Sequence, residues 1–129
     1  MRQTCNGHSS YVNDASVSRN GQLIVSASHD KSLIVWDTNN GNELRKLTGH
    51  TKSVNGCAFS QDSRFIVSAS YDKSLRVWDS QSSELLRELT GHSGLVYCCD
   101  VSCDDLILSG SQDKSLKTWN LDGNCLRTF

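Results

Sequence analysis

The chain has 129 residues and a net charge of −1, with 36% hydrophobic and 21% charged residues and six cysteines. This composition leaves no basic face large enough for nucleic acid and no apolar run as long as a membrane span, and the first residues, MRQTCNGHSS, lack the apolar region of a signal peptide. We therefore expect an intracellular protein, cytoplasmic or nuclear, that keeps its cysteines reduced and binds neither nucleic acid nor membrane.

One phrase recurs along the chain, and its spacing sets the expected organisation. It reads SASHDKSLIVWD at 26–37, SASYDKSLRVWD at 68–79 and SGSQDKSLKTWN at 109–120. A Gly-His pair precedes each copy, and successive pairs are 42 residues apart. Self-similarity at such a period is the sequence signature of a repeat architecture. Because the copies fill almost the whole chain, we expect a single repeat array over residues 1–129.

The first unit of the array, about 8–47, is expected to consist of short strands between turns. Residues 1–7 precede it and are interpreted as the remnant of a preceding fourth strand. Within the unit, Asn20-Gly21 and Asn40-Gly41 mark the hairpins, because these dipeptides accept left-handed turn conformations.

The second and third units follow the same plan. The second, about 50–89, predicts strands at Val54–Phe59, Phe65–Ser70, Leu75–Asp79 and Glu84–Leu89. The third, about 92–129, has SCDD where the second has SQDSR, so one residue is missing from a turn. It ends in GNCLRTF, which matches GNELRKL at 41–47 and supplies a fourth strand. Each unit is therefore predicted to be a four-stranded antiparallel meander, and the fold class to be all-β.

These units resemble the WD-repeat β-propeller family. The resemblance rests on the Gly-His pair, the Ser-x-Ser-x-Asp phrase and the Trp-Asp pair at a period near 42, and it fails only at Asn120, where the family has Asp. It implies that each meander is one blade of a propeller. It also implies a non-catalytic scaffold or adaptor for protein partners, without a cofactor.

The resemblance further implies one side-chain network in each blade. In the first, the Trp36 indole donates a hydrogen bond to Ser26, the Ser26 hydroxyl donates to His8, and the other His8 nitrogen donates to Asp30. The equivalent sets are Trp78, Ser68, His50 and Asp72 in the second blade, and Trp119, Ser109, His92 and Asp113 in the third. Each group has the donor or acceptor that its neighbour needs, so a partly buried polar chain can be fully satisfied and fix the Gly-His loop to the blade.

Ser, His and Asp in one network also define a rival hypothesis, a serine hydrolase. An active site is normally single, whereas this set occurs three times. The chain has no G-x-S-x-G elbow, and each serine is expected to be held by a tryptophan. We therefore expect no catalytic residue and no enzyme.

The cysteines at Cys98, Cys99 and Cys103 raise the question of a metal site. Neighbouring residues in a strand face opposite sides, so Cys98 and Cys99 cannot both point at one ion. Cys99 aligns with Cys57 and Ala15 at what is expected to be a small core position. Structural thiols and no metal are therefore expected.

A set of variable positions is the candidate partner-binding surface. By the family resemblance, these positions lie on the face where many propellers bind peptides near the central channel. The set comprises Tyr11, Asn13, His29, Ser53, Asn55, Tyr71, Leu95, Tyr97 and Gln112. Exposed aromatic residues in it would serve as anchors for a peptide segment. The alternative is that the blades are purely structural and have no partner of their own. Unselected substitution on such a surface explains the same variation.

Three blades raise the question of how their outer faces are covered. Closed propellers have about four to eight blades, and both faces of a blade are apolar where neighbours stack. One interpretation is a fragment or isoform of a longer, seven-bladed array. The other is a head-to-tail pair of chains that makes six blades.

Overall fold

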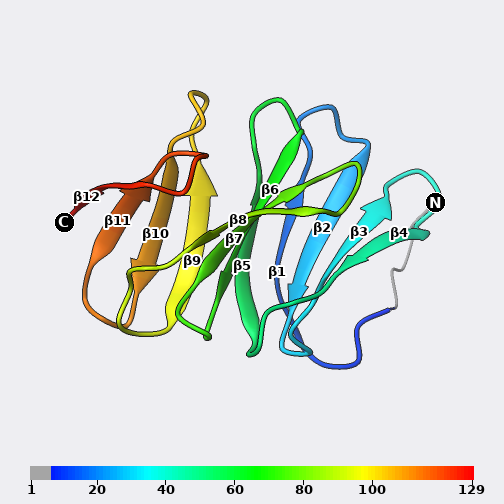
Figure 1. The fold of residues 1–129 in the computed structure, drawn as a ribbon. Helices are drawn as coiled ribbons and strands as arrows, with labels where there is room; N and C mark the ends of the chain where they lie inside the picture. The colour runs from blue at the N-terminus through cyan, green and yellow to red at the C-terminus, as the bar shows by residue number, and fades with distance from the viewer. Residues whose placement is uncertain (1–6) are drawn as a thin grey trace.

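The computed structural model describes residues 7–129, which contain twelve β-strands and no helix. Within this range there is accordingly no helical segment that could span a membrane. The strands form three separate four-stranded sheets, and every pairing between neighbouring strands is antiparallel. Figure 1 shows the sheets side by side in chain order. The all-β fold of three four-stranded blades is confirmed.

Each sheet is a meander whose strands pair in sequence order. The first blade comprises β1 (Val12–Val17), β2 (Leu23–Ser28), β3 (Leu33–Asp37) and β4 (Glu43–Leu47). The second blade comprises β5 (Val54–Phe59), β6 (Phe65–Ser70), β7 (Leu75–Asp79) and β8 (Leu85–Leu89). The third blade comprises β9 (Val96–Val101), β10 (Ile107–Ser111), β11 (Leu116–Trp119) and β12 (Cys125–Thr128). The expected remnant strand at residues 1–7 lies, apart from Gly7, outside the described residues.

The hydrophobic cores lie between blades, because successive side chains of a strand point to opposite faces of its sheet. At the first junction, buried side chains of the first blade, Val25, Ala27, Leu33, Val35 and Leu47, meet buried side chains of the second, Val54, Cys57, Phe59, Ile66 and Trp78. At the second junction, the equivalent residues Val67, Ala69, Leu75, Val77 and Leu89 meet Val96, Ile107 and Trp119. The second blade thus supplies one face to the first blade and the other face to the third.

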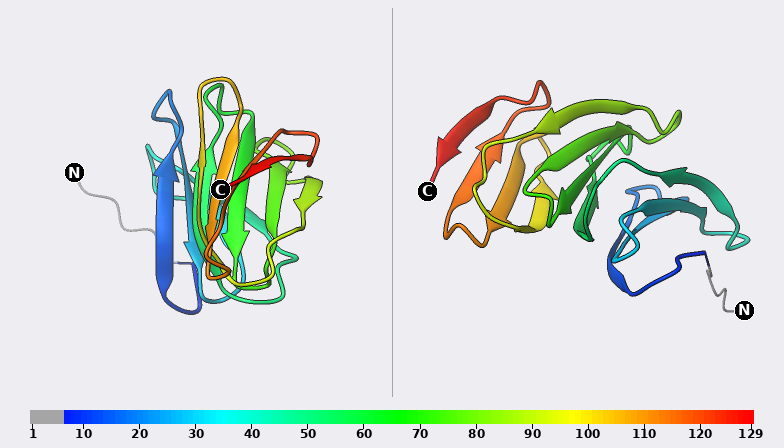
Figure 2. Two further views of the ribbon diagram at one scale, coloured as in Figure 1. Left: turned by 90° about the vertical axis from the view of Figure 1, so that its left-hand side faces the viewer. Right: turned by 60° about the horizontal axis from the view of Figure 1, so that its bottom comes forward.

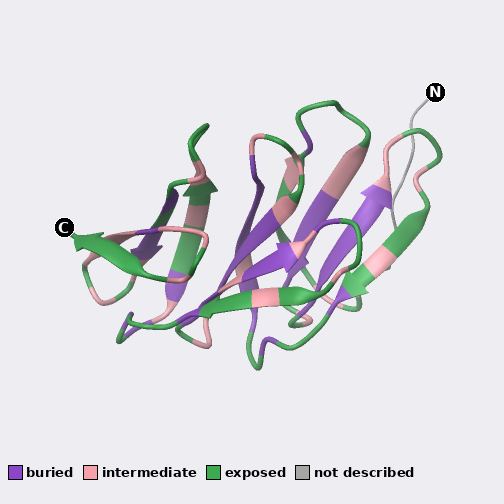
Figure 3. Cartoon of the chain, turned by 45° about the horizontal axis from the view of Figure 1, so that its top comes forward, coloured by how far each residue is buried: buried purple, intermediate pink, exposed green. Residues whose placement is uncertain are grey.

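The first strands of the blades, β1, β5 and β9, lie next to one another. Their backbones approach closely at Gly56 in β5, where an added Cβ would lie 3.1 Å from the Cα atom of Cys98 in β9. The fourth strands are on the outside of the array, and β12 is exposed along its whole length (Figure 3). Figure 2 shows in its right-hand view that the first and third blades stand at opposite ends of an arc that does not close.

One expectation about the core is wrong at the end of this arc. Ala15, in β1, was expected at a small core position with Cys57 and Cys99. Cys57 is buried and Cys99 half-buried, but Ala15 is exposed because no blade in the described range covers that face of the first sheet. Ala15 pairs with Ser26 as Cys57 pairs with Ser68, so the two residues hold equivalent positions and differ only in whether a described blade lies against them.

The turns between second and third strands have a lysine in the left-handed region. Lys31, Lys73 and Lys114 have φ values of 75°, 73° and 73°. In the second blade the turn is closed by a hydrogen bond from the Lys73 backbone N–H to the Ser70 carbonyl oxygen, 3.3 Å. Glycine adopts this conformation without steric cost, whereas a side chain with a Cβ does not.

The first prediction concerns this strain. We expect Lys73→Gly to raise the free energy of unfolding by about 0.5 kcal/mol, because relief of the left-handed strain outweighs the added entropy of the unfolded chain. Denaturant unfolding provides the measurement. The matched control is Lys46→Gly in β4, an exposed lysine in extended backbone, which should lower stability by about 0.5–1 kcal/mol. Equal effects of the two substitutions would contradict the prediction.

Candidate functional site

Each blade contains a chain of three side-chain hydrogen bonds that links its elements. The tryptophan lies on the third strand, the serine on the second strand, the aspartate in the turn between them, and the histidine in the loop before the first strand. In the second blade, Trp78 Nε1 donates to Ser68 Oγ over 2.9 Å. His50 Nε2 lies 2.7 Å from the same Ser68 oxygen, and His50 Nδ1 lies 2.7 Å from Asp72 Oδ2.

These contacts determine which atom donates and which accepts in each hydrogen bond of the network. Ser68 Oγ accepts the indole N–H, so its own hydroxyl hydrogen is available to donate to His50 Nε2. The imidazole proton is then on Nδ1 and is donated to the Asp72 carboxylate. Ser68 is fully buried and His50 nearly so, which makes each of these partners costly to lose.

The other two blades repeat the same geometry. In the first, the distances from Trp36 to Ser26, Ser26 to His8 and His8 to Asp30 are 2.8, 2.6 and 2.9 Å. In the third, the distances from Trp119 to Ser109, Ser109 to His92 and His92 to Asp113 are 2.9, 2.7 and 2.8 Å. All twelve residues predicted for the networks are therefore brought together in three sets of four.

Sequence reasoning missed two further serines in each network. In the second blade, the Ser74 hydroxyl donates to Asp72 Oδ1, and the Ser74 backbone N–H donates to the same oxygen. The Ser70 hydroxyl donates to the Ser53 carbonyl oxygen over 2.9 Å and accepts the Asp72 backbone N–H. The signal was present, because both serines belong to the repeated phrase Ser-x-Ser-x-Asp-Lys-Ser.

Asn120 replaces the aspartate of the Trp-Asp pair without losing its contact. Asp37 and Asp79 each accept a backbone N–H two residues ahead, both at 2.8 Å, and so hold the turn before the fourth strand. Asn120 Oδ1 accepts the backbone N–H groups of Asp122 and Asn124 at 3.1 and 3.0 Å. An amide oxygen accepts such bonds as a carboxylate does, so the third blade keeps this turn.

The network carboxylates are held in their charged form. Burial alone would raise the pKa of the Asp72 carboxyl, but hydrogen bonds from His50 and from the Ser74 side chain and backbone outweigh it. The pKa of Asp72 therefore lies well below its usual range, as do those of Asp30 and Asp113.

The candidate partner-binding residues lie at the same end of the blades as the histidine loops. In each blade a backbone hydrogen bond joins two of them across adjacent loops. The backbone N–H groups of His29, Tyr71 and Gln112 donate to the carbonyl oxygens of Tyr11, Ser53 and Leu95, at 2.9, 2.9 and 2.8 Å. The structure thus places six of the nine predicted positions in three pairs, one pair per blade.

The remaining positions connect one blade to the next. Asn13 Nδ2 donates to Ser53 Oγ and to Asn55 Oδ1, both at 3.1 Å, so this cluster spans the first junction. Ser53 is buried beneath it and is not available to a partner. At the second junction, the rings of Tyr71 and Tyr97 meet edge to face with centroids 5.8 Å apart. Tyr97 is 44% exposed, whereas Tyr71 is half-buried.

The five cysteines within residues 7–129 are free thiols. Cys57 is buried with its Sγ atom 3.6 Å from the Val25 carbonyl oxygen, and burial raises the pKa of its thiol. Cys99 makes the equivalent contact with the Val67 carbonyl oxygen, whereas Cys98 is exposed. Within residues 7–129, no group of three or more His, Cys, Asp or Glu side chains is placed to hold a metal ion.

The second prediction tests the hydrogen-bond chain. His50→Ala should lower the free energy of unfolding by about 1–3 kcal/mol, because it removes the acceptor of the buried Ser68 hydroxyl and the imidazole N–H that donates to Asp72. The control is Ser83→Ala in the turn before β8. The Ser83 hydroxyl is buried and has no hydrogen-bond partner in the described residues, so its loss should be close to neutral. Equal midpoints of thermal unfolding for the two variants would show that these hydrogen bonds do not stabilise the blade.

The third prediction follows from the pKa of Asp72. A carboxyl whose pKa is lower in the folded chain than its ordinary value of 3.8 contributes stability above that value. This contribution is lost as the pH falls through the folded-state pKa. We therefore expect the free energy of unfolding to decrease steeply below about pH 4, and the slope to be smaller in Asp72→Asn, as measured by denaturant titrations at several pH values. Parallel slopes for the two proteins would contradict the assignment.

Comparison with known protein families places this geometry in context. The family model described as "WD domain, G-beta repeat" matches residues 1–37, 41–79 and 83–120. A search of curated proteins found no match to the chain. The second and third matched segments each begin two residues before the fourth strand of the preceding blade, so the sequence repeat is offset from the structural blade by one strand. Since three matches together cover most of the chain, the protein belongs to the WD-repeat family.

Proposed function

We propose that the protein is a non-catalytic scaffold that presents the histidine-loop end of its blades to peptide segments of intracellular protein partners, in the cytoplasm or the nucleus. The observation that carries this proposal is the Tyr71–Tyr97 pair. The two rings make an edge-to-face contact between neighbouring blades, at the end where backbone hydrogen bonds join the loops. WD repeats generally mediate protein–protein interactions, which agrees with this use of the fold.

Rigidity of this end supports binding at low entropic cost. The Tyr71 backbone is fixed by its hydrogen bond to Ser53, and the Tyr71 ring is packed against Tyr97. Tyrosine offers a large contact area with few rotatable bonds, so an already ordered tyrosine loses little freedom when a partner binds. The partly exposed ring of Tyr97 is the expected anchor.

Charge at this end favours an acidic segment. Lys31, Lys52, Lys73 and Lys114 lie exposed in the loops there, and no ion pair joins their ammonium groups to a carboxylate within residues 7–129. The carboxylates in the same loops are those of the networks, and each already accepts several hydrogen bonds. A partner with Asp or Glu residues beside an apolar side chain fits this combination.

The hydrolase alternative is disfavoured by the environment of the serines. Ser68 and Ser109 are fully buried, and each Oγ atom accepts a tryptophan N–H. A substrate carbonyl would have to displace that tryptophan before either hydroxyl could attack. Labelling of Ser26, Ser68 or Ser109 by a fluorophosphonate probe in the folded protein would overturn the non-catalytic proposal.

The fourth prediction concerns partner capture. Tyr97→Ala should reduce the amount of each specific partner recovered from a cell lysate by at least about tenfold, because truncation of a central aromatic anchor typically costs 2 kcal/mol or more. Tyr71→Ala should do the same by removing the ring that positions Tyr97. The control is Leu85→Ala on the outer strand β8. Unchanged partner lists for both tyrosine variants would favour purely structural blades.

A further inference from the structure

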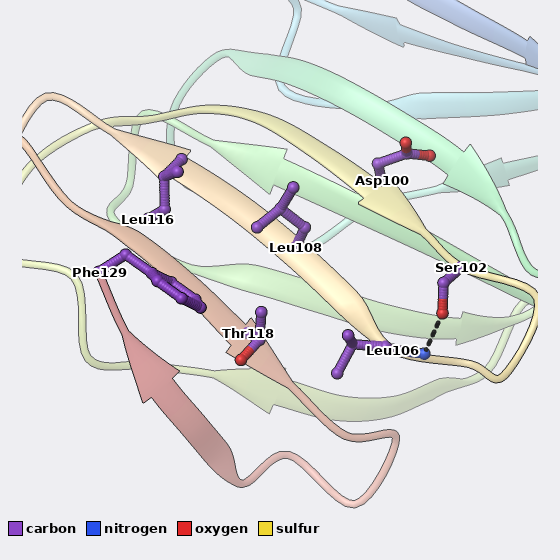
Figure 4. Close-up of a pocket in the computed structure, with 7 residues that line it drawn as sticks. All are labelled: Asp100, Ser102, Leu106, Leu108, Leu116, Thr118 and Phe129. Atoms are coloured by element: carbon purple, nitrogen blue, oxygen red, sulfur yellow. Dashed lines mark hydrogen bonds between the residues drawn. The ribbon is translucent and has the colours of Figure 1, made fainter.

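The third blade has an apolar face that is buried in the other two blades. Leu108, Leu116 and Phe129 on this face are 40%, 47% and 64% exposed. They hold the positions of Val67, Leu75 and Leu89 in the second blade, all of which are fully buried at the second junction. With Leu106 and Thr118 they line a hollow of about 380 Å³, bounded at one edge by Asp100 and Ser102 (Figure 4).

The first blade has the opposite face open. Val12 and Val17 in β1 are 57% and 58% exposed, whereas their equivalents Val54 and Phe59 in β5 are buried at the first junction. Val12 and Ala15 line a second, smaller hollow together with Ile24, His8, Ser26 and Trp36. One chain therefore exposes both halves of a blade junction, at opposite ends of the arc.

The two open faces are of the same two kinds as the faces that meet at each junction inside the chain, so they are complementary to each other. Both internal junctions join the same two kinds of face: aliphatic residues of second, third and fourth strands on one side, and residues of the first and second strands with the tryptophan on the other. The open face of the third blade supplies the first kind, and the open face of the first blade supplies the second kind.

We infer that a second copy of this chain covers these faces, with the third blade of each copy packed against the first blade of the other. Such a head-to-tail contact is heterologous, so it forms a closed assembly only when the rotations sum to a full turn. Two chains of three blades make a ring of six, within the usual range of about four to eight, and three chains exceed that range. Each blade then turns the ring by about 60°, and both junctions close simultaneously.

The second copy also extends the end that the proposed function assigns to partners, and this step rests on that proposal. At the first internal junction, Asn13 contacts Ser53 of the next blade. At the junction between copies, Tyr97 holds the position of Asn13, and Tyr11 of the second copy holds the position of Ser53. Two exposed tyrosines from different chains are thereby placed side by side.

The test is the mass of the 129-residue chain in solution, measured by size-exclusion chromatography with light scattering over a range of concentrations. We expect a species of twice 14.3 kDa at the upper concentrations. A mass of 14.3 kDa at every concentration would overturn the inference, and so would a continuous series of larger masses, because an open polymer is not a ring.

Charged substitutions locate the contact. Leu116→Glu and Val12→Glu place a carboxylate in each half of the junction, and each should raise the dissociation constant of the dimer by at least about 100-fold. Leu85→Glu is the matched control, because Leu85 is 39% exposed on the middle blade and the first blade has Glu43 at its position. A dimer that survives both junction variants, or that is lost in the control, contradicts the inference.

Folding and function are separated by two further readouts. Val12 and Leu116 are exposed in the single chain, so circular dichroism should show unchanged strand content in both variants; if one variant unfolds, the other decides the test. Partner capture by Leu85→Glu and by the junction variants is then compared. If Leu85→Glu still dimerises but no longer captures partners, the result contradicts the proposed partner site and leaves the ring standing. If the unmodified chain is a monomer, the result contradicts the ring and leaves the proposed partner site standing.

Discussion

The need of a WD blade to be covered on both faces governs the rest of the structure. A four-stranded meander has no core of its own, because its apolar side chains alternate between two faces. Each large aliphatic side chain that becomes buried contributes roughly 1.5–3 kcal/mol, and this burial occurs only where a neighbouring blade is present. Leu75 is fully buried and Leu116 is half-exposed at equivalent positions, so the difference lies in the neighbour and not in the sequence. The stability of each blade is therefore a property of the array.

The polar networks complement this stacking within each blade. Apolar packing alone does not determine where the loop before the first strand lies. The chain from Trp78 through Ser68 and His50 to Asp72 ties that loop to the second and third strands, and the added hydroxyls of Ser70 and Ser74 fix the turn itself. The loops and turns that these bonds fix also contain Tyr71 and Leu95, and Leu95 lies two residues before Tyr97. The bonds that stabilise a blade therefore also preorganise its surface.

Much of the fold could be predicted from the three sequence repeats, and the networks were implied by the resemblance to the WD-repeat family. Spacing fixed the blades, and the donor and acceptor types of Trp, Ser, His and Asp matched the bonds that the structure contains. The side-chain neighbours across junctions could not be predicted in the same way. Whether Ala15 is buried, or Ser53 lies beneath Asn13, depends on which blade stands beside it, and no local pattern records this.

Hydrogen exchange measured by mass spectrometry tests most directly the claim that neighbours stabilise each blade. The measurement is made at concentrations above and below self-association. The account predicts strong protection of β6 and β7 under both conditions, and protection of β1 and β11 that increases only on association, because these strands carry the open faces. Equal protection of β1, β11, β6 and β7 in the dilute sample would contradict it.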